Sequence, residues 1–130
     1  MREILFRGKR IDNGEWVYGN LNYGTIEIKS IKGSYYISDF DVNPWDKKFY
    51  PVIPESVGQY TGLTDKNGKK IFEGDIIFDP ELKENHIVMF DEGGFCTEEM
   101  FLQFYLCFDE MEVEVIGNIY DNPELLEVKE

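Results

Sequence analysis

Residues 59–77 read QYTGLTDKNGKKIFEGDII, and this stretch decides the fold class. At its centre, Asn67-Gly68 is a strong short-range signal for a β-hairpin, because both residue types tolerate positive φ angles. The flanking segments, 57–61 and 71–78, are rich in β-branched and aromatic residues, and Asp65 can accept hydrogen bonds from its own turn. The stretch therefore predicts two antiparallel strands joined by a tight turn.

The N-terminal half continues this pattern of short strands. Alternation of apolar and polar side chains predicts strands over residues 2–7 and 15–21, and the turn signal Asp12-Asn13-Gly14 joins them into a hairpin. The same alternation predicts one half-buried strand over 25–31 and a further strand over 34–38. These segments indicate an antiparallel sheet.

Three prolines punctuate the middle of the chain, at positions 44, 51 and 54. Proline interrupts regular structure, so this stretch is the best candidate for a boundary. We expect an N-terminal β lobe over about 1–56 and a C-terminal lobe over about 57–130, within one small domain.

The C-terminal half also reads as short strands and tight turns. It predicts a helical turn begun by Asp79-Pro80, a strand over 87–90, a turn over 91–94, a strand with an acidic face of Glu110, Glu112 and Glu114, and a closing helix begun by Asn122-Pro123. Residues 97–108 fit a strand or a helix, and the alternation leans to strand. The fold class is therefore mainly β, with only short helical turns.

Charge is distributed unevenly along the chain, whose net charge is −13. Residues 78–130 carry fifteen acids and two lysines, whereas residues 1–50 carry eight Lys or Arg and seven acids. An acidic half repels the phosphates of nucleic acid and disfavours it as a partner. The one basic cluster, Arg7-Gly8-Lys9-Arg10, is typical of a solvated strand end.

The residue types needed for catalysis are sparse. His86 is the only histidine, and Cys96 and Cys107 lack the spacing of a metal or redox motif. No apolar run approaches the roughly 20 residues of a membrane span, and charges interrupt the first ten residues. We expect free thiols in a reducing cytoplasm, no membrane association, no cofactor, no metal and no enzymatic activity.

Three segments carry a family resemblance: MREILFR at 1–7, the opening stretch at 59–77, and EVIGNIYDNPEL at 114–125. Together they resemble the YopX family of small phage and prophage proteins over the whole chain. Leu5 and Thr64 stand where lysine is usual in that family, and Phe72 replaces a tyrosine. The resemblance implies a mainly β fold with an SH3-type barrel in the C-terminal part, a bacterial host cell, and an uncharacterised role.

Seven residues are candidates for binding a partner: Gln59, Tyr60, Thr61, Asn118, Glu110, Glu112 and Glu114. The first four are polar side chains of the resembling segments that turn geometry does not explain, and structural hydrogen bonding is their competing interpretation. The three glutamates form the acidic strand face.

Three functional hypotheses remain open. The preferred one is a non-catalytic accessory protein that binds a host or phage protein. The alternative is a nucleic-acid-binding small barrel, with stacking and phosphate contacts from Arg2, Arg7, Lys9, Arg10, Tyr18 and Tyr23. The third is a metal-dependent enzyme built from carboxylates. Exposed strand edges would in addition allow homo-oligomers.

Overall fold

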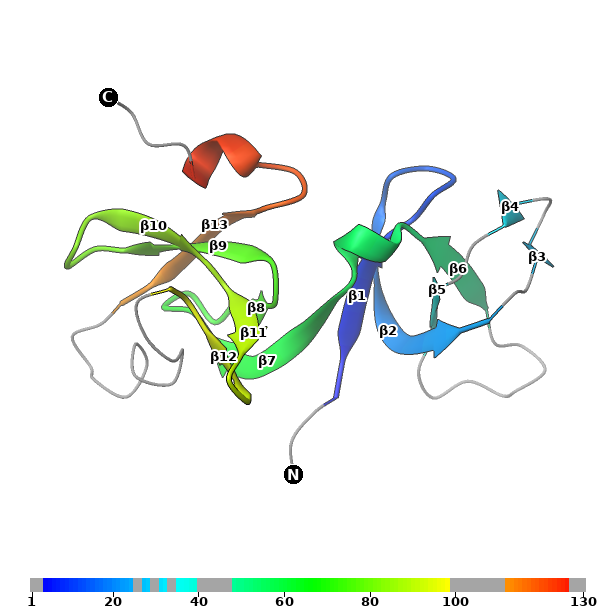
Figure 1. Cartoon of the computed structure of the whole chain (residues 1–130), viewed down its shortest axis with the longest axis horizontal. Helices are drawn as coiled ribbons and strands as arrows, with labels where there is room; N and C mark the ends of the chain where they lie inside the picture. The colour runs from blue at the N-terminus through cyan, green and yellow to red at the C-terminus, as the bar shows by residue number, and fades with distance from the viewer. Residues whose placement is uncertain are drawn as a thin grey trace. The chain divides into compact units, whose positions relative to one another are not determined.

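The computed structural model describes residues 4–24, 27–28, 31–32, 35–39, 48–98 and 112–126. The chain forms two compact units, residues 1–59 and 60–130 (Figure 1). Short antiparallel strands and tight turns build both units, which confirms the mainly β fold class. None of the sheets within the described residues closes on itself, so the SH3-type barrel stays a prediction.

The N-terminal unit holds the first six strands, a 3-10 helix and the start of β7. They are β1 (Phe6–Lys9), β2 (Trp16–Tyr23), β3 (Glu27–Ile28), β4 (Ile31–Lys32), β5 (Tyr35–Ser38), β6 (Phe49–Val52), η1 (Pro54–Ser56) and the first residues of β7 (Gly58–Thr64). Their sheet runs in the order β6-β5-β2-β1-β7. The predicted β1–β2 hairpin is confirmed, with Gly14 in its turn at φ 73°.

Two predictions for this unit were wrong. The first strand spans Phe6–Lys9 instead of ending at Arg7. Gly8 and Lys9 continue the strand because they pair antiparallel with Val17 and Trp16 of β2. Within the predicted single strand over 25–31, the described residues belong to two short strands, β3 and β4, which pair with each other antiparallel. Alternation alone does not reveal such a pairing.

The N-terminal unit buries Leu5, Tyr36, Ile37 and Val52. Val52 also forms an antiparallel bridge with Arg10, which ties β6 to the residues that follow β1. The backbone N–H of Ile53 donates to Lys9 O at 2.9 Å, and that of Ile11 donates to Pro51 O at 3.0 Å. This stretch of β6 is therefore hydrogen-bonded on both sides.

The C-terminal unit contains the rest of β7 and six further strands. They are β8 (Lys70–Phe72), β9 (Asp75–Asp79), β10 (Glu84–Ile87), β11 (Met89–Asp91), β12 (Gly94–Cys96) and β13 (Glu114–Asn118), followed by the 3-10 helix η2 (Pro123–Leu126). β7 pairs with β8, β9 lies between β10 and β13, and β11 and β12 form a separate hairpin. The closing helix is confirmed as one short 3-10 segment.

The hairpin predicted around Asn67-Gly68 is confirmed. Gly68 has φ 80°, and the N–H of Asp65 donates to Lys69 O at 2.8 Å across the turn. Asn67 is not among the positive-φ residues, so glycine alone supplies the left-handed conformation.

Three further predictions need correction. Asp79-Pro80 starts a hairpin turn between β9 and β10, not a helical turn, because β9 extends through Asp79. The strand over 87–90 is divided at Val88, whose N–H and C=O bond to Asp75 and Gly74. The acidic strand begins only at Glu114, where β13 starts. The segment 99–111, which holds most of the strand-or-helix question, lies outside the described residues.

The core of the C-terminal unit is formed by residues that are distant in sequence. Ile71, Ile77, Val88, Val113 and Val115 form one buried cluster, and Leu63 and Phe95 pack against it from the side. Apolar burial of this kind is the main term that stabilises a small β unit. The cluster therefore sets where the surface residues around it point.

Candidate functional site

Asp65 connects the β7–β8 hairpin to β13. Its Oδ1 accepts hydrogen bonds from the N–H groups of Asn67 at 2.8 Å and Lys69 at 2.9 Å, and its Oδ2 accepts one from Val115 at 3.0 Å. Burial by itself would raise the pKa of this carboxyl, but the three backbone donors outweigh it and hold the pKa below the usual value. The predicted bonds within the turn are confirmed, and the bond to Val115 is additional.

Two other buried carboxylates also serve the fold. Asp75 Oδ2 accepts from the N–H of Phe72 at 2.7 Å, and Asp79 Oδ1 accepts from the N–H of Glu81 at 2.9 Å. Both side chains are buried. A buried carboxylate that satisfies backbone donors at a turn is a structural group.

The remaining acids of the described C-terminal unit lie at its surface. They are Glu73, Glu81, Glu84, Asp91, Glu92, Glu98, Glu112, Glu114, Asp121 and Glu124, all exposed or half-buried. The described part of this unit contains four lysines, Lys66, Lys69, Lys70 and Lys83. This acidic surface, defined by the ten carboxylates above, is the strongest electrostatic feature of the unit.

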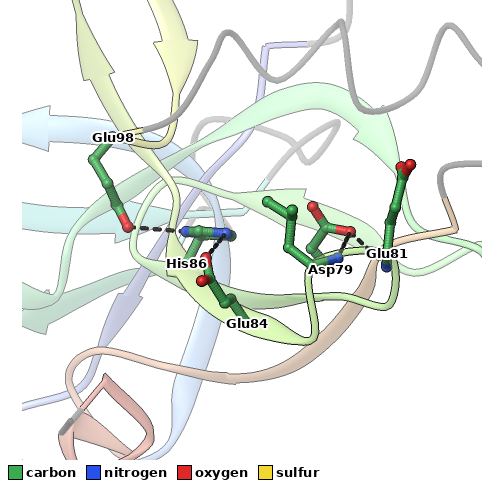
Figure 2. A network of polar contacts seen from close by, with 6 residues as sticks. Asp79, Glu81, Glu84, His86 and Glu98 are labelled. Carbon is green, nitrogen blue, oxygen red and sulfur yellow. Dashed lines mark hydrogen bonds and ion pairs between the residues drawn. The ribbon is translucent and has the colours of Figure 1, made fainter.

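His86 lies beneath part of the acidic surface. Only 2% of its side chain is exposed, yet its Nδ1 lies 2.9 Å from Glu98 Oε1 and its Nε2 lies 3.6 Å from Glu84 Oε2. Figure 2 shows the imidazole between these two carboxylates. Glu84 and His86 are two residues apart and share one face of β10, which is a partial signal in the sequence, but nothing in the sequence pointed to Glu98.

Burial and this hydrogen bond act on Glu98 in opposite directions. Desolvation would raise the pKa of its carboxyl, whereas the hydrogen bond with His86 lowers it. The net result is a pKa below the ordinary glutamate value. Glu98 is therefore held ionised beside a histidine that the strand buries.

The structure places the predicted residues of β7 mostly inside. Tyr60 is buried with its ring centroid 5.6 Å from that of Phe72. Thr61 is also buried, and its hydroxyl donates to Ile71 O at 2.8 Å. Gln59 is half-buried in the pairing with Phe6 of β1. These contacts favour the structural interpretation of Tyr60 and Thr61.

Two of the remaining predicted partner-binding residues, Asn118 and Glu114, also make contacts within the fold. Asn118 organises the turn before η2: its Oδ1 accepts from the N–H of Asp121 at 2.8 Å. Glu114 accepts from Asn67 Nδ2 at 3.3 Å and lies 3.8 Å from Lys66 Nζ. Glu112 is exposed, and Glu110 lies outside the described residues.

Two residues of the basic cluster on which the nucleic-acid hypothesis depends, Arg7 and Arg10, make contacts with neighbouring side chains. Arg7 is buried with its guanidinium carbon 4.9 Å from the Trp16 ring centroid. Arg10 pairs with Asp12 at 2.6 Å. Tyr18 and Tyr23 are exposed, and Arg2 lies outside the described residues.

Phe90, an exposed apolar residue of the C-terminal unit, was not among the predicted partner-binding residues. Phe90, on β11, exposes 54% of its side chain. Its ring meets Phe95 of β12 edge-on, with centroids 5.1 Å apart and planes at 76°. Phe90 lies in a strand predicted from the sequence, but an aromatic residue gives no sign of which face of the strand it occupies.

Within the described residues, no group of three or more His, Cys, Asp or Glu side chains is arranged to hold a metal ion. Nor does any helix there have the length and apolar character that crossing a membrane requires. Cys96 is a free, half-buried thiol, and Cys107 lies outside this part of the chain.

Comparison with known proteins places the chain in a family. None of the curated proteins compared with it matches. Among solved structures, it is similar to the crystal structure of protein EF1440 from Enterococcus faecalis, with 26% identity, a TM-score of 0.59, and coverage of 98% of this chain and 100% of that one. The family model described as YopX protein matches residues 5–127. This match extends over nearly the whole chain, and the protein belongs to the YopX family.

Proposed function

We propose that this protein is a non-catalytic accessory protein of phage or prophage origin that binds another protein through its acidic surface in the bacterial cytoplasm. The main evidence is that the carboxylates of the described C-terminal unit fall into two groups, one buried and one at the surface. Asp65, Asp75 and Asp79 are buried and hold turns together, whereas the ten surface acids far outnumber the four lysines of the described C-terminal unit. The excess of negative charge at the surface is therefore separate from the three buried carboxylates that hold turns together.

Electrostatics select the kind of partner. A negative field accelerates encounter with a basic protein surface and repels acidic ones, and its effect weakens as salt rises. The partner is a host or phage protein with a basic face, and binding requires no cofactor.

Affinity capture with a matched pair of variants tests this function. The double variant Glu81→Gln/Glu112→Gln removes two exposed charges from the acidic surface, and Glu15→Gln/Glu55→Gln removes two exposed charges from the N-terminal unit. If exposed ion pairs contribute about 0.2–1 kcal/mol each, the first pair lowers partner affinity at least about twofold. The second pair leaves affinity unchanged. Equal effects of both pairs, or capture that does not weaken with salt, would overturn the proposal.

A nucleic-acid-binding role is the second candidate, because Tyr18 and Tyr23 offer exposed rings for base stacking. The burial of Arg7 and the pairing of Arg10 with Asp12 leave fewer cations for phosphates than this role requires. A mobility-shift assay with single-stranded DNA at two salt concentrations decides the matter. Binding that falls steeply with salt and is lost in Tyr18→Ala supports it. The absence of a shift at low salt rejects it.

A further inference from the structure

Phe90 is exposed on a strand whose neighbour is anchored in the core. In the β11–β12 hairpin, Phe90 lies directly opposite Phe95. Phe95 packs against the buried cluster of the C-terminal unit, and its edge-on contact with Phe90 restricts the position of the Phe90 ring. A large apolar ring is thus held at the surface in a defined position.

The turn of this hairpin is also well defined. Glu92 and Gly93 both have positive φ, at 49° and 80°, between the paired residues Asp91 and Gly94. Two consecutive positive φ angles are those of a type I′ turn, whose twist matches the strands that it joins. Asp91 Oδ1 accepts from the N–H of Glu92 at 2.9 Å. Binding through such a preformed hairpin costs little ordering entropy.

The chain segment that carries the ring has acidic residues and no lysine or arginine. Residues 84–98 contain Glu84, Asp91, Glu92 and Glu98, all exposed, and no lysine or arginine. Interfaces gain most of their affinity from a few ordered aromatic or arginine side chains surrounded by a polar rim. Phe90 and the four acids of its own segment supply residues of both kinds.

We propose that the β11–β12 hairpin is the contact by which the proposed function operates, with Phe90 as its apolar anchor in a pocket of the partner lined by arginine and lysine. The inference rests on the proposed function and adds the residue and the chemistry of the partner surface. Arginine suits both parts of this contact, since its guanidinium packs on an aromatic face and pairs with carboxylates. Nucleic acid and a second copy of this chain, also at −13, are disfavoured by repulsion.

Site-specific photo-crosslinking of the full chain in bacterial cells tests the contact. The photoreactive residue p-benzoylphenylalanine replaces Phe90 in one protein, Glu112 in a second and Tyr18 in a third. We expect position 90 to crosslink a protein of net positive charge, and position 18 to crosslink none. The crosslinked protein, once purified, is then measured for binding to unmodified variants.

Two apolar side chains of nearly equal exposure form the matched comparison. Phe90→Ser should weaken binding of the crosslinked protein at least about tenfold, as loss of an interface anchor does. Leu82→Ser, at 50% exposure against 54% for Phe90, should change it less than about twofold. If Phe90→Ser does not fold, Glu92→Gln replaces it as the test, with weaker binding and a smaller salt dependence expected.

The outcomes separate the anchor from the general function. A basic partner that crosslinks at position 112 and not at 90 overturns the anchor and leaves the proposed function standing. The absence of crosslinking at both positions overturns both. Crosslinking at position 90 to an acidic protein, to nucleic acid or to a second copy overturns the anchor, as does equal affinity of Phe90→Ser and wild type.

Discussion

The side-chain Oδ2 of Asp65 accepts a hydrogen bond from the backbone N–H of Val115 at 3.0 Å, although the two residues are 50 positions apart in the chain. The neighbouring N–H of Lys66 donates to Val113 O at 3.1 Å. The turn that begins the C-terminal unit is thus fastened to the strand that ends it. These groups of residues 113 and 115 are consequently not available to pair with another strand, which limits self-association at this point.

Replacing Asp65 with asparagine tests this junction. The amide keeps the shape of the carboxylate but replaces one acceptor oxygen with an NH2 group, so at least one buried backbone donor loses its partner. We expect a loss of about 1–3 kcal/mol in the free energy of unfolding, measured by urea denaturation. Glu81→Gln is the control, because it makes the same carboxylate-to-amide change at an exposed position, and it should change stability by less than about 0.5 kcal/mol. Equal stability of Asp65→Asn and wild type would mean that the junction contributes nothing.

The same carboxyl makes stability depend on pH. Because the pKa of Asp65 is lower in the folded protein than in the unfolded chain, its contribution is complete above the ordinary aspartate pKa of about 3.9. That contribution falls as the pH drops through the lowered pKa of the folded state. Wild type should therefore lose more stability on acidification below about pH 4 than Asp65→Asn does. Parallel curves for the two proteins would show that Asp65 titrates normally.

Gly68 is predicted to be essential through its backbone and not through packing. Its φ is 80°, and a Cβ built there would have no atom within 4 Å. Gly68→Val should therefore cost about 1–3 kcal/mol from conformational strain alone, measured as a shift of the urea midpoint. Gly68→Asn should cost less, because asparagine tolerates the left-handed region. Equal losses in both variants would point to a steric cause.

Glu98 offers a direct measurement of its contact with His86. By NMR of the side-chain carboxyl carbon, Glu98 should titrate below the ordinary glutamate value of about 4.3. In His86→Ala the lowering hydrogen bond is gone, so the Glu98 pKa should rise towards or above that value. An unchanged Glu98 midpoint in His86→Ala would contradict the contact.

Repulsion within the acidic surface should make stability sensitive to salt. Raising the ionic strength from about 0.01 M to about 0.1 M shortens the screening length from about 30 Å to about 10 Å, so wild type should become more stable. Glu81→Gln/Glu112→Gln should reduce this gain by a few tenths of a kcal/mol, whereas Glu15→Gln/Glu55→Gln should not. Thermal unfolding at the two salt concentrations measures the difference. A wild-type gain retained in full by the first pair would show that these carboxylates do not repel one another.

Local sequence determined much of this fold. Asn67-Gly68 and Asp12-Asn13-Gly14 predicted their hairpins correctly, because a turn depends on the φ preferences of adjacent residues. The alternation of Val113 and Val115 with glutamates predicted a strand with one acidic face, and both valines are buried. The family also followed from short motifs, since these belong to the turns and strand ends that build the fold.

Only the tertiary structure decided what depends on residues distant in sequence. No local pattern shows that Asp65 reaches Val115, that Val52 packs against Gly8, or that Glu98 meets a buried His86. The same limit applies to the candidate surface: the sequence located the negative charge, but the exposure of Phe90 and the burial of Tyr60 and Thr61 depend on strand pairing and on the core. Turn preferences and side-chain periodicity are properties of neighbouring residues, whereas burial is a property of packed strands.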